Sequence, residues 1–436
     1  MLKSDISRRK ALKTLALSAY ASVQIVPRHV LGGEGYTPPS EMITRGVIGI
    51  GSQGSRHLGK NSSGGKKQAV LVAVSDVDTI RMNKLRKEIR KYQDWRELID
   101  QKDIDVIHIP TPPHWHGLMA IAAANAGKDI WCEKPMTRTI GEGIKLVEAC
   151  KRNGTILRVN TFVRMGESNF YGTGSTAKEC RKLIKSGMLG WPLKVVVSGE
   201  TGFIWKHGWS GKFNLKPEKV PDTLDYDMWL GPAPWKPYTA HRTGVYNPKG
   251  TFRGYWDYDG GGLGDMAMHY LDPIQYILGK DHTSPVRVEV DTDDQHPDVV
   301  RPWRRVTLKY ADGCEIILDG NKSITGAALF EGPKGKVYKG FKSNIPNLRK
   351  KVAELPDPAP MEQDFFKCVR ERKKFGLDEV KAHRSTTMVN ISKIALRLNR
   401  SLDFDPVKQR FINDEEANSY IYQPMRSPWT LPGEQV

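Results

Sequence analysis

A glycine-rich loop, GIGSQG at residues 49–54, constrains the possible folds of this chain more than any other stretch. It follows a β-branched run and matches the spacing G-x-G-x-x-G. In that spacing the first glycine makes a tight turn, the second lets the backbone approach a pyrophosphate, and the third lets a helix pack closely on a strand. The helix that follows presents its positive end to the negative charge. Because the motif is weak by itself, its meaning depends on the elements around it.

Those elements alternate. The pattern predicts a strand–helix repeat that runs to residue 160, and such alternation is typical of a parallel, doubly wound Rossmann sheet. The predicted strands are 44–51, 69–76, 104–112, 129–135 and 155–160, and the predicted helices are 79–91, 94–99, 116–127 and 139–154. Asp94 is expected to cap one helix, and Thr139 with Glu142 to form a capping box on another.

The pattern changes after about residue 165. Residues 193–203 alternate like an antiparallel strand, residues 287–320 resemble a meander with turns at 312–313 and 319–320, and a helical tail covers 361–400. We therefore expect a second, α+β domain with a large open antiparallel sheet. The predicted segments are 1–40, which is left out of the fold, 44–165, the Rossmann domain, and 166–436, the second domain.

Net charge and cysteine spacing limit the kinds of partner, disulfide and metal site that we expect. The net charge is +18, but the positive residues are dispersed, so a basic solvated surface is favoured and no nucleic-acid partner is expected. The five cysteines form no CxxC pair, which argues for buried free thiols and against a disulfide framework or a zinc site. His114 and His116 lack a nearby cysteine or carboxylate, so no metal site is expected.

The N-terminus carries Arg8 and Arg9 ahead of a moderately apolar stretch, residues 11–26. This resembles a twin-arginine export signal, and it predicts a periplasmic protein. A cytosolic amphipathic arm is the alternative. The apolar run is too short and polar for stable membrane insertion.

The glycine loop and Asp76 together predict a dinucleotide site. Asp76 ends the second strand, 22 residues past Gly54. A carboxylate there binds ribose hydroxyls and repels a 2′-phosphate, which favours NAD over NADP, although Arg81 lies close in sequence. The expected cofactor contacts are Gly49, Gly51, Ser52, Gln53, Gly54, Asp76, Thr111, Pro112, His114, His116, Glu133 and Lys134.

Two further stretches suggest chemistry. Lys134 follows the fourth strand, at the sheet edge where ligands bind, and either polarises a substrate oxygen or is a solvated lysine. In GGGLGDMAMHYLD, residues 260–272, Asp265 and His269 are four apart and share a face of the predicted helix. Spacing alone leaves a catalytic pair and a structural salt link both open. The three glycines are expected to let the backbone pass close to a ligand.

Several motifs together resemble the Gfo/Idh/MocA oxidoreductase family, the glucose–fructose oxidoreductase and inositol dehydrogenase group, in its twin-arginine-exported branch. They are the glycine loop, TPPHWHG (111–117), EKPMTRT (133–139), LDYDMWLGPAPWKPY (224–238), FRGYWDYDGGGLGDMAMHYLD (252–272) and EANSYIYQPMRSPW (416–429). The resemblance implies a Rossmann domain, a C-terminal domain whose open sheet commonly forms a homodimer or homotetramer face, and hydride transfer between NAD(P) and a hydroxyl carbon of a sugar or cyclitol.

The resemblance also assigns roles. Lys134, Asp265 and His269 would be catalytic: His269 removes a hydroxyl proton, Lys134 steadies the alkoxide, and Asp265 orients the imidazole or binds a neighbouring hydroxyl. Substrate contacts would come from Arg164, Trp205 and Trp256 as well as Asp265 and His269, with core packing as the alternative for each tryptophan.

Export implies a tightly bound cofactor, because free NAD is scarce outside the cytoplasm. The first functional hypothesis is a sugar, glycoside or cyclitol oxidoreductase. The second is a glycosidase that works by oxidation, elimination and reduction. A third, from another class, is a non-catalytic NAD(P)-binding sensor.

Overall fold

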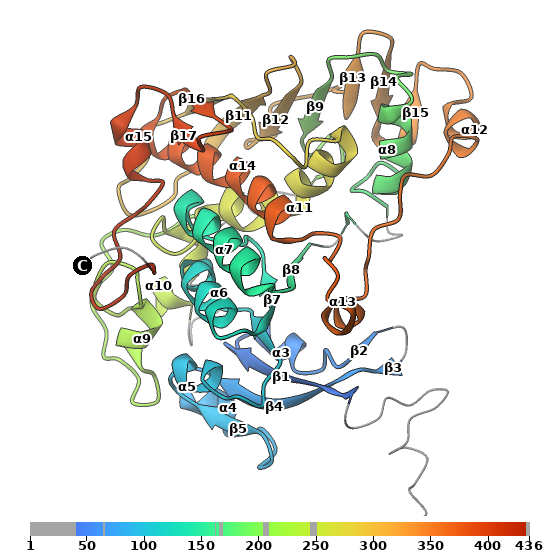
Figure 1. The fold of residues 1–436 in the computed structure, drawn as a ribbon. Coiled ribbons are helices and arrows are strands. Elements are labelled where there is room, and N and C mark those ends of the chain that lie inside the picture. The colour runs from blue at the N-terminus through green and yellow to red at the C-terminus, as the bar shows by residue number, and fades with distance from the viewer. Residues whose placement is uncertain are drawn as a thin grey trace, which may run out of the picture.

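The structure, a computed structural model, describes residues 41–63, 66–161, 163–164, 169–203, 209–244 and 251–432. Figure 1 shows two sheets separated by helices. The predicted export signal, residues 1–40, lies outside the described residues, and so does Trp205.

The first sheet has six parallel strands in the order β5-β4-β1-β6-β7-β8, so its strands, counted in chain order, read 3-2-1-4-5-6. That order is typical of a dinucleotide-binding fold, and the predicted Rossmann sheet is confirmed. Its strands are β1 Ile43–Ile48, β4 Ala69–Ser75, β5 Arg90–Tyr92, β6 Val106–Ile109, β7 Asp129–Glu133 and β8 Leu157–Asn160. Around them lie α3 Gly54–His57, α4 Thr79–Met82, α5 Trp95–Ile99, η2 Pro113–Trp115, α6 His116–Asn125 and α7 Ile140–Asn153, with a small ribbon of β2 Ser62–Ser63 and β3 Lys66–Lys67.

Local signals set several helix ends. Asp94 caps α5 by accepting from the backbone N–H of Arg96, and Thr139 and Glu142 form the predicted capping box on α7. The helix predicted over 79–91 is wrong. It ends after one turn, and residues 90–92 instead pair with β4 as the edge strand β5, because strand pairing outweighs local helix propensity there.

The second sheet has nine strands in the order β15-β14-β13-β9-β12-β11-β10-β16-β17. The predicted meander is present as β10–β12, but the sheet is mixed, since β9 runs parallel to β12. Its strands are β9 Lys194–Val197, β10 Arg287–Thr292, β11 Trp303–Lys309, β12 Glu315–Asp319, β13 Phe330–Gly332, β14 Gly335–Tyr338, β15 Lys342–Ser343, β16 Leu402–Asp405 and β17 Arg410–Phe411.

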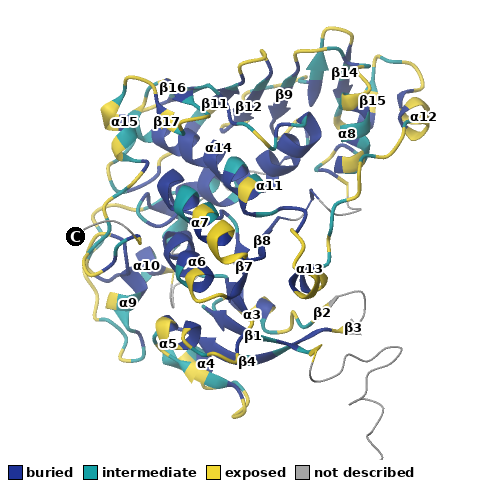
Figure 2. Cartoon of the chain, viewed as in Figure 1, coloured by how far each residue is buried: buried dark blue, intermediate teal, exposed yellow. Residues whose placement is uncertain are grey.

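Helices α11 and α14 lie between the two sheets, and most of their residues are buried (Figures 1 and 2). The molecule has two parts, each built around one of the two sheets. Helix α14 contacts α7 of the first part and β10 of the second part, so it joins the two parts. The helices of the second part are α8 Ala177–Lys185, α9 Tyr226–Leu230, α10 Ala240–Thr243, η3 Phe252–Gly254, α11 Gly261–Leu278, η4 Lys339–Phe341, α12 Leu348–Ala353, α13 Phe365–Glu371, α14 Glu379–Leu398 and α15 Glu415–Ser419. In the described part of the chain, no helix has the length and apolar character needed to cross a bilayer.

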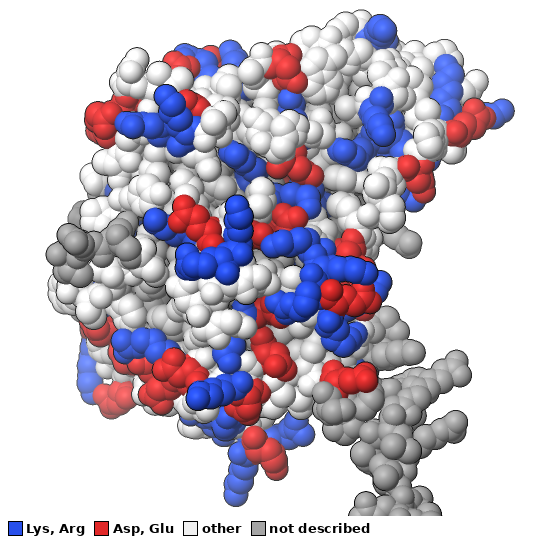
Figure 3. All heavy atoms as spheres, in the orientation of Figure 1, with Lys and Arg blue, Asp and Glu red and all other residues white. Residues whose placement is uncertain are grey.

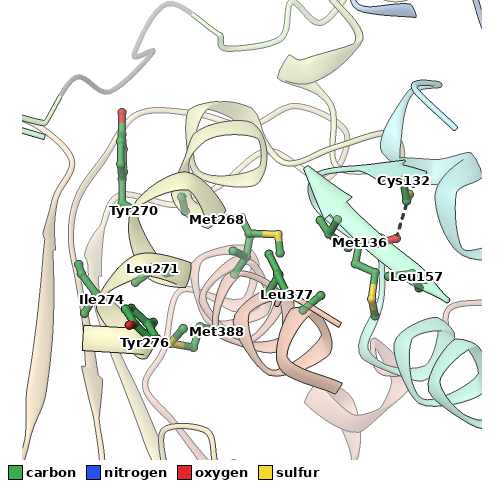
Figure 4. Packing of buried hydrophobic residues seen from close by; sticks show 14 of the residues in the cluster. Cys132, Met136, Leu157, Met268, Tyr270, Leu271, Ile274, Tyr276, Leu377 and Met388 are labelled. Carbon is green, nitrogen blue, oxygen red and sulfur yellow. Dashed lines mark hydrogen bonds between the residues drawn. The ribbon is translucent and has the colours of Figure 1, made fainter. Parts of the chain in front are cut away.

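One apolar core extends through both parts. Figure 4 shows Met136, from the loop after β7, in the same cluster as Met268 of α11 and Met388 of α14. Thr386 links the first two, since its hydroxyl accepts from the Met136 backbone N–H and lies 3.5 Å from the Met268 sulfur. This packing fixes the loop that carries Lys134 against helix α11.

All five cysteines are buried free thiols, as predicted. Figure 3 shows basic and acidic side chains interspersed on the face that it presents, in keeping with a dispersed positive charge.

Candidate functional site

The glycine loop has the geometry that its spacing predicts. Gly49 has a φ of +85°, which side chains rarely adopt. A Cβ at Gly54 would lie 1.9 Å from the Gly49 carbonyl oxygen, so only glycine allows α3 to approach β1 this closely. A Cβ at Gly51 would meet only the Arg81 guanidinium, at 3.5 Å, which leaves open space beside the backbone. The loop between these glycines is partly exposed and includes Ser52 and Gln53.

Asp76 supports this loop. One carboxylate oxygen accepts from the Ile50 backbone N–H at 2.7 Å, and the other accepts from Asp78 at 2.9 Å. Burial raises the pKa of Asp76 against the opposing effect of these two hydrogen bonds. The Arg81 Nε lies 3.9 Å from the same carboxylate. A cation and a carboxylate therefore share the place where the sequence predicts ribose recognition.

Glu133 holds the loop to the next strands from inside. Its Oε1 accepts from Gln53 at 2.9 Å and from Asn160 at 2.8 Å, and it lies 2.8 Å from the His57 ring. Burial alone would raise the pKa of Glu133, but the hydrogen bonds from His57 and Gln53 lower it to about 2. Glu133 is thus an ionised anchor for the loop, and a direct contact with a cofactor stays a prediction.

The segment after β6 is fixed by histidines. His114 is fully buried, hydrogen-bonds to the Trp229 carbonyl at 3.1 Å and packs against Tyr258. His116 contacts the carbonyl oxygens of Pro135 and Thr111, at 2.7 and 2.8 Å. This burial argues for a structural role for both rings rather than the expected cofactor contact.

Thr111 and Pro112 remain partly exposed, beside the glycine loop. A Cβ at Gly49 would lie 2.8 Å from the Thr111 methyl group, so the two loops touch.

Lys134 and Asp265 meet across the junction of the two parts. The lysine Nζ donates to the Asp265 carboxylate and to its backbone carbonyl, each at 2.8 Å. Arg253 Nε donates to the same carboxylate oxygen at 2.9 Å. Burial would raise the pKa of Asp265, but the charges of Lys134 and Arg253 lower it. The carboxylate is therefore ionised and shared by two cations.

His269 lies one turn further along α11, on the same helix face. Its ring is buried, and burial together with the charge on Lys134 lowers the pKa of His269 to about 3. The imidazole is therefore neutral throughout the physiological range, and neutral imidazole is the form that accepts a proton.

The glycines at the start of α11 pack against other residues of the protein. The helix begins at Gly261. Gly260 and Gly261 have φ values of +134° and +71°, and a Cβ at Gly260 would lie 2.9 Å from the Lys393 side chain. These internal contacts account for Gly260 and Gly261, and the expected close approach of a ligand stays a prediction.

Asp259, directly before these glycines, is the other acid at the helix start. It is fully buried, and among the described residues neither carboxylate oxygen has a hydrogen-bond partner. Burial and the nearby charge of Asp265 raise the pKa of Asp259 to about 7.

Arg164 is paired inside the protein. Its guanidinium is buried and bonds to Asp272, with Nε–Oδ1 at 2.9 Å, and to Asp281, with Nη2–Oδ1 at 2.6 Å. Its position after β8 led to the expected substrate contact, but the structure pairs it with two internal carboxylates, which leaves that expectation without support.

Trp256 is also buried, and its indole N–H donates to the His296 carbonyl at 3.1 Å. Trp209 lies against Arg253, with the guanidinium 4.7 Å from the ring centroid. Trp209 is therefore linked to Asp265 through Arg253, which contacts both.

Two residues of this site were not singled out by sequence reasoning. Arg253 and Asp259 both lie in the quoted motif FRGYWDYDGGG, and only the fold shows that they flank Asp265. A cation and an acid close before a glycine run were the available signal. In the described part of the chain, no group of three or more His, Cys, Asp or Glu side chains could hold a metal ion.

Comparisons with known proteins place the chain in a family. The chain is 33% identical over 156 residues to the inositol 2-dehydrogenase of Salmonella typhimurium, which covers 34% of this chain and 44% of that protein. It is 24% identical over 230 residues to a glycosyl hydrolase family 109 protein of Shewanella pealeana, which covers 48% of each. The chain thus spans less than half the length of these curated relatives.

Among solved structures, the WlbA dehydrogenase from Bordetella pertussis, in complex with NADH and UDP-GlcNAcA, has a TM-score of 0.56 at 19% identity. The match covers 84% of this chain and 99% of that one, and it shows a shared fold.

The family descriptions match more of the chain. One, the NAD-binding Rossmann fold of the oxidoreductase family, matches residues 43–161, and the other, the C-terminal alpha/beta domain of that family, matches residues 173–431. With its Rossmann sheet, its glycine loop and both family domains, the chain belongs to the Gfo/Idh/MocA oxidoreductase family.

Proposed function

We propose that this protein is an NAD(P)-dependent oxidoreductase that acts on a hydroxyl-bearing carbon of a sugar, glycoside or cyclitol. The observation that carries the proposal is the contact between Lys134 and Asp265, at 2.8 Å, with the neutral His269 one helical turn away. It brings a cation from the end of β7 together with an acid and a base from α11. A structural salt link between Asp265 and His269 would need a charged imidazole, whereas the ring of His269 is neutral.

The glycine loop fits a dinucleotide. The open space beside Gly51 and the tight packing at Gly54 are the features that a pyrophosphate site needs. A bound nicotinamide would accept the hydride that leaves the substrate carbon. Asp76 favours NAD over NADP, and the proposed export favours tight retention of the cofactor.

The chain's own residues account for the proton. His269 accepts the proton of the substrate hydroxyl, which its neutral ring permits. Lys134 stabilises the negative charge that grows on that oxygen, because its ammonium is held by Asp265 and does not need to reorganise. The substrate loses one hydride and one proton, and the hydroxyl carbon becomes a carbonyl carbon.

A second candidate is a glycosidase that oxidises, eliminates and then reduces. It is favoured by the similarity to the glycosyl hydrolase family 109 protein over 48% of each chain. The same three residues would serve its oxidation step, so product analysis, rather than geometry, separates the two candidates.

The test starts with the protein as purified. We expect NAD(H) or NADP(H) in the supernatant after denaturation, identified by mass, and a change in nicotinamide absorbance when monosaccharides, glycosides and inositols are added in turn. Product analysis then separates oxidation from bond cleavage. A protein that holds no nicotinamide, and that oxidises none of these compounds even with added NAD or NADP, would contradict the proposal.

A further inference from the structure

A small pocket lies where the N-terminus of α7, helix α14 and the segment after α15 meet. It does not include the Lys134–Asp265 pair or the glycine loop. Its lining holds three cations, Arg138, Lys393 and Arg397, and no acidic residue among the described residues that line it. Trp256 and Tyr420 also line it.

Two buried donors in this lining lack partners. Arg138 is 3% exposed and Asn390 is 2% exposed. Neither the Arg138 Nε nor the Asn390 Nδ2 has a hydrogen-bond partner among the described residues. A buried donor without a partner is costly, so these two groups mark the wall of the pocket as poor in hydrogen-bond acceptors.

The cations are only partly satisfied. Lys393 Nζ donates to the Arg138 carbonyl at 3.3 Å and to the Asn390 side-chain oxygen at 3.2 Å, both long for a charged donor. Arg397 donates to the Pro297 carbonyl at 3.3 Å and lies over the Tyr420 ring. Each cation therefore has donors left over.

Two acids lie behind the pocket wall. Glu142 Oε1 is 3.9 Å from the Arg138 Nε, beyond hydrogen-bond distance, and Glu142 Oε2 accepts from the Arg138 backbone N–H. Asp259 is the other acid, and its charge raises the pKa of Lys393 against the lowering effect of burial. Two acids do not fully offset three cations, so the pocket keeps a net positive charge.

We propose that this pocket binds a small oxyanion, either a phosphate group or the carboxylate of a sugar acid. The three lining cations carry hydrogen-bond donors and no acceptors, so the matching ligand offers acceptors and a negative charge. Because Lys393 packs against Gly260, the oxyanion would bind next to the start of the helix that carries Asp265 and His269.

The test is calorimetric titration of the full protein, saturated with NAD so that phosphate cannot occupy the glycine loop. Inorganic phosphate and glucuronate are titrated separately against a chloride background of equal ionic strength. Arg397→Gln removes a cation of the pocket, and Arg384→Gln is its matched control. Arg384 also lies on α14 and also donates to a proline carbonyl, that of Pro406, but it does not line the pocket.

We expect saturable binding of phosphate, of glucuronate or of both, and the probe that binds identifies the ligand class. Arg397→Gln should weaken binding about tenfold or more, as expected for loss of a charged hydrogen bond. Arg397→Lys should lose less affinity than Arg397→Gln, because lysine keeps the positive charge. Arg384→Gln should leave the affinity unchanged.

Absence of saturable binding for both probes, or an equal loss in the two glutamine variants, would overturn the proposal. The readout is heat of binding, so it does not depend on turnover. If NAD did not bind, the same titration without NAD would still compare the two variants. A failure of the proposed function would therefore be distinguishable from a failure of oxyanion binding.

Discussion

At the scale of single residues, Asp265 has a more defined position than its spacing from His269 suggests. Its carboxylate accepts from both Lys134 and Arg253, so it is already committed to two cations. This favours a role in holding the lysine ammonium in place. The expected role of Asp265 in orienting the imidazole stays a prediction.

Asp259 should make stability depend on pH. Its buried carboxyl lies near Asp265, Arg253, Lys134 and Lys393, and its folded-state pKa is raised to about 7 from 3.8. Between these pH values the folded protein holds a proton that the unfolded chain releases, so stability falls as the pH rises through this window. Asp259→Asn cannot ionise and should gain stability relative to the parent protein from pH 5 to pH 8.

Chemical denaturation of both proteins at the two pH values measures this difference. An equal difference at pH 5 and pH 8 would show that Asp259 does not titrate in this window.

At the scale of elements, the first turn of α11 contains Gly264, although helix propensity alone would favour alanine there. In a helix interior alanine is favoured over glycine by about 1 kcal/mol. At Gly264, however, a Cβ would lie 2.6 Å from the Asp259 carboxylate and 2.9 Å from its backbone carbonyl. Gly264→Ala should therefore lower the free energy of unfolding by about 1–3 kcal/mol, as overpacking does.

Thermal and urea unfolding measure this change, and Gly59→Ala is the control. Gly59 is exposed, and a Cβ there would meet no atom within 4 Å. If Gly264→Ala were as stable as the control, the packing at the start of α11 would be looser than the structure indicates.

Most elements of the first part could be predicted from the sequence, because their signals are local. The capping box at Thr139 and the left-handed Gly154 mark the ends of α7 in the sequence itself. The helix over 79–91 could not be excluded, because strand β5 exists only through pairing with β4. The parallel pairing of β9 with β12 is likewise a long-range choice that alternation does not reveal.

The candidate site follows the same division. Lys134 and Asp265 were predicted from motifs, and the fold brings them together at 2.8 Å. Arg164 was predicted from its place after a strand, but its fate depended on Asp272 and Asp281, which lie more than a hundred residues away. The pairing of buried charges depends on tertiary structure. The position of Arg164 in the sequence therefore did not reveal these two partners.

At the scale of the whole molecule, the candidate site exists only where the two parts meet. Lys134 comes from the Rossmann part, and Asp265 and His269 come from the second part, on a helix packed into a core common to both. The domain bounds at 44–165 and 166–436, and association of copies through the nine-stranded sheet, stay predictions.

Export is a further proposal at this scale. We expect the protein in the periplasmic fraction of a cell with a twin-arginine pathway, and Arg8→Lys with Arg9→Lys should keep it in the cytoplasm, because that pathway reads the arginine pair. Lys10→Arg, next to the pair, should leave export unchanged. Fractionation and immunodetection measure the outcome, and unchanged export of the double variant would contradict this role for the pair.

The central claim is that His269 and Lys134 move the proton and stabilise the charge in a hydride-transfer reaction. The most direct measurement is the turnover of a confirmed substrate by His269→Ala and Lys134→Ala, with His282→Ala, an exposed histidine, as control. The account predicts a loss of about 10²–10⁴-fold for His269→Ala, a comparably severe loss for Lys134→Ala, and bound cofactor and fold retained in both. Turnover within a few-fold of the parent protein in His269→Ala would contradict it.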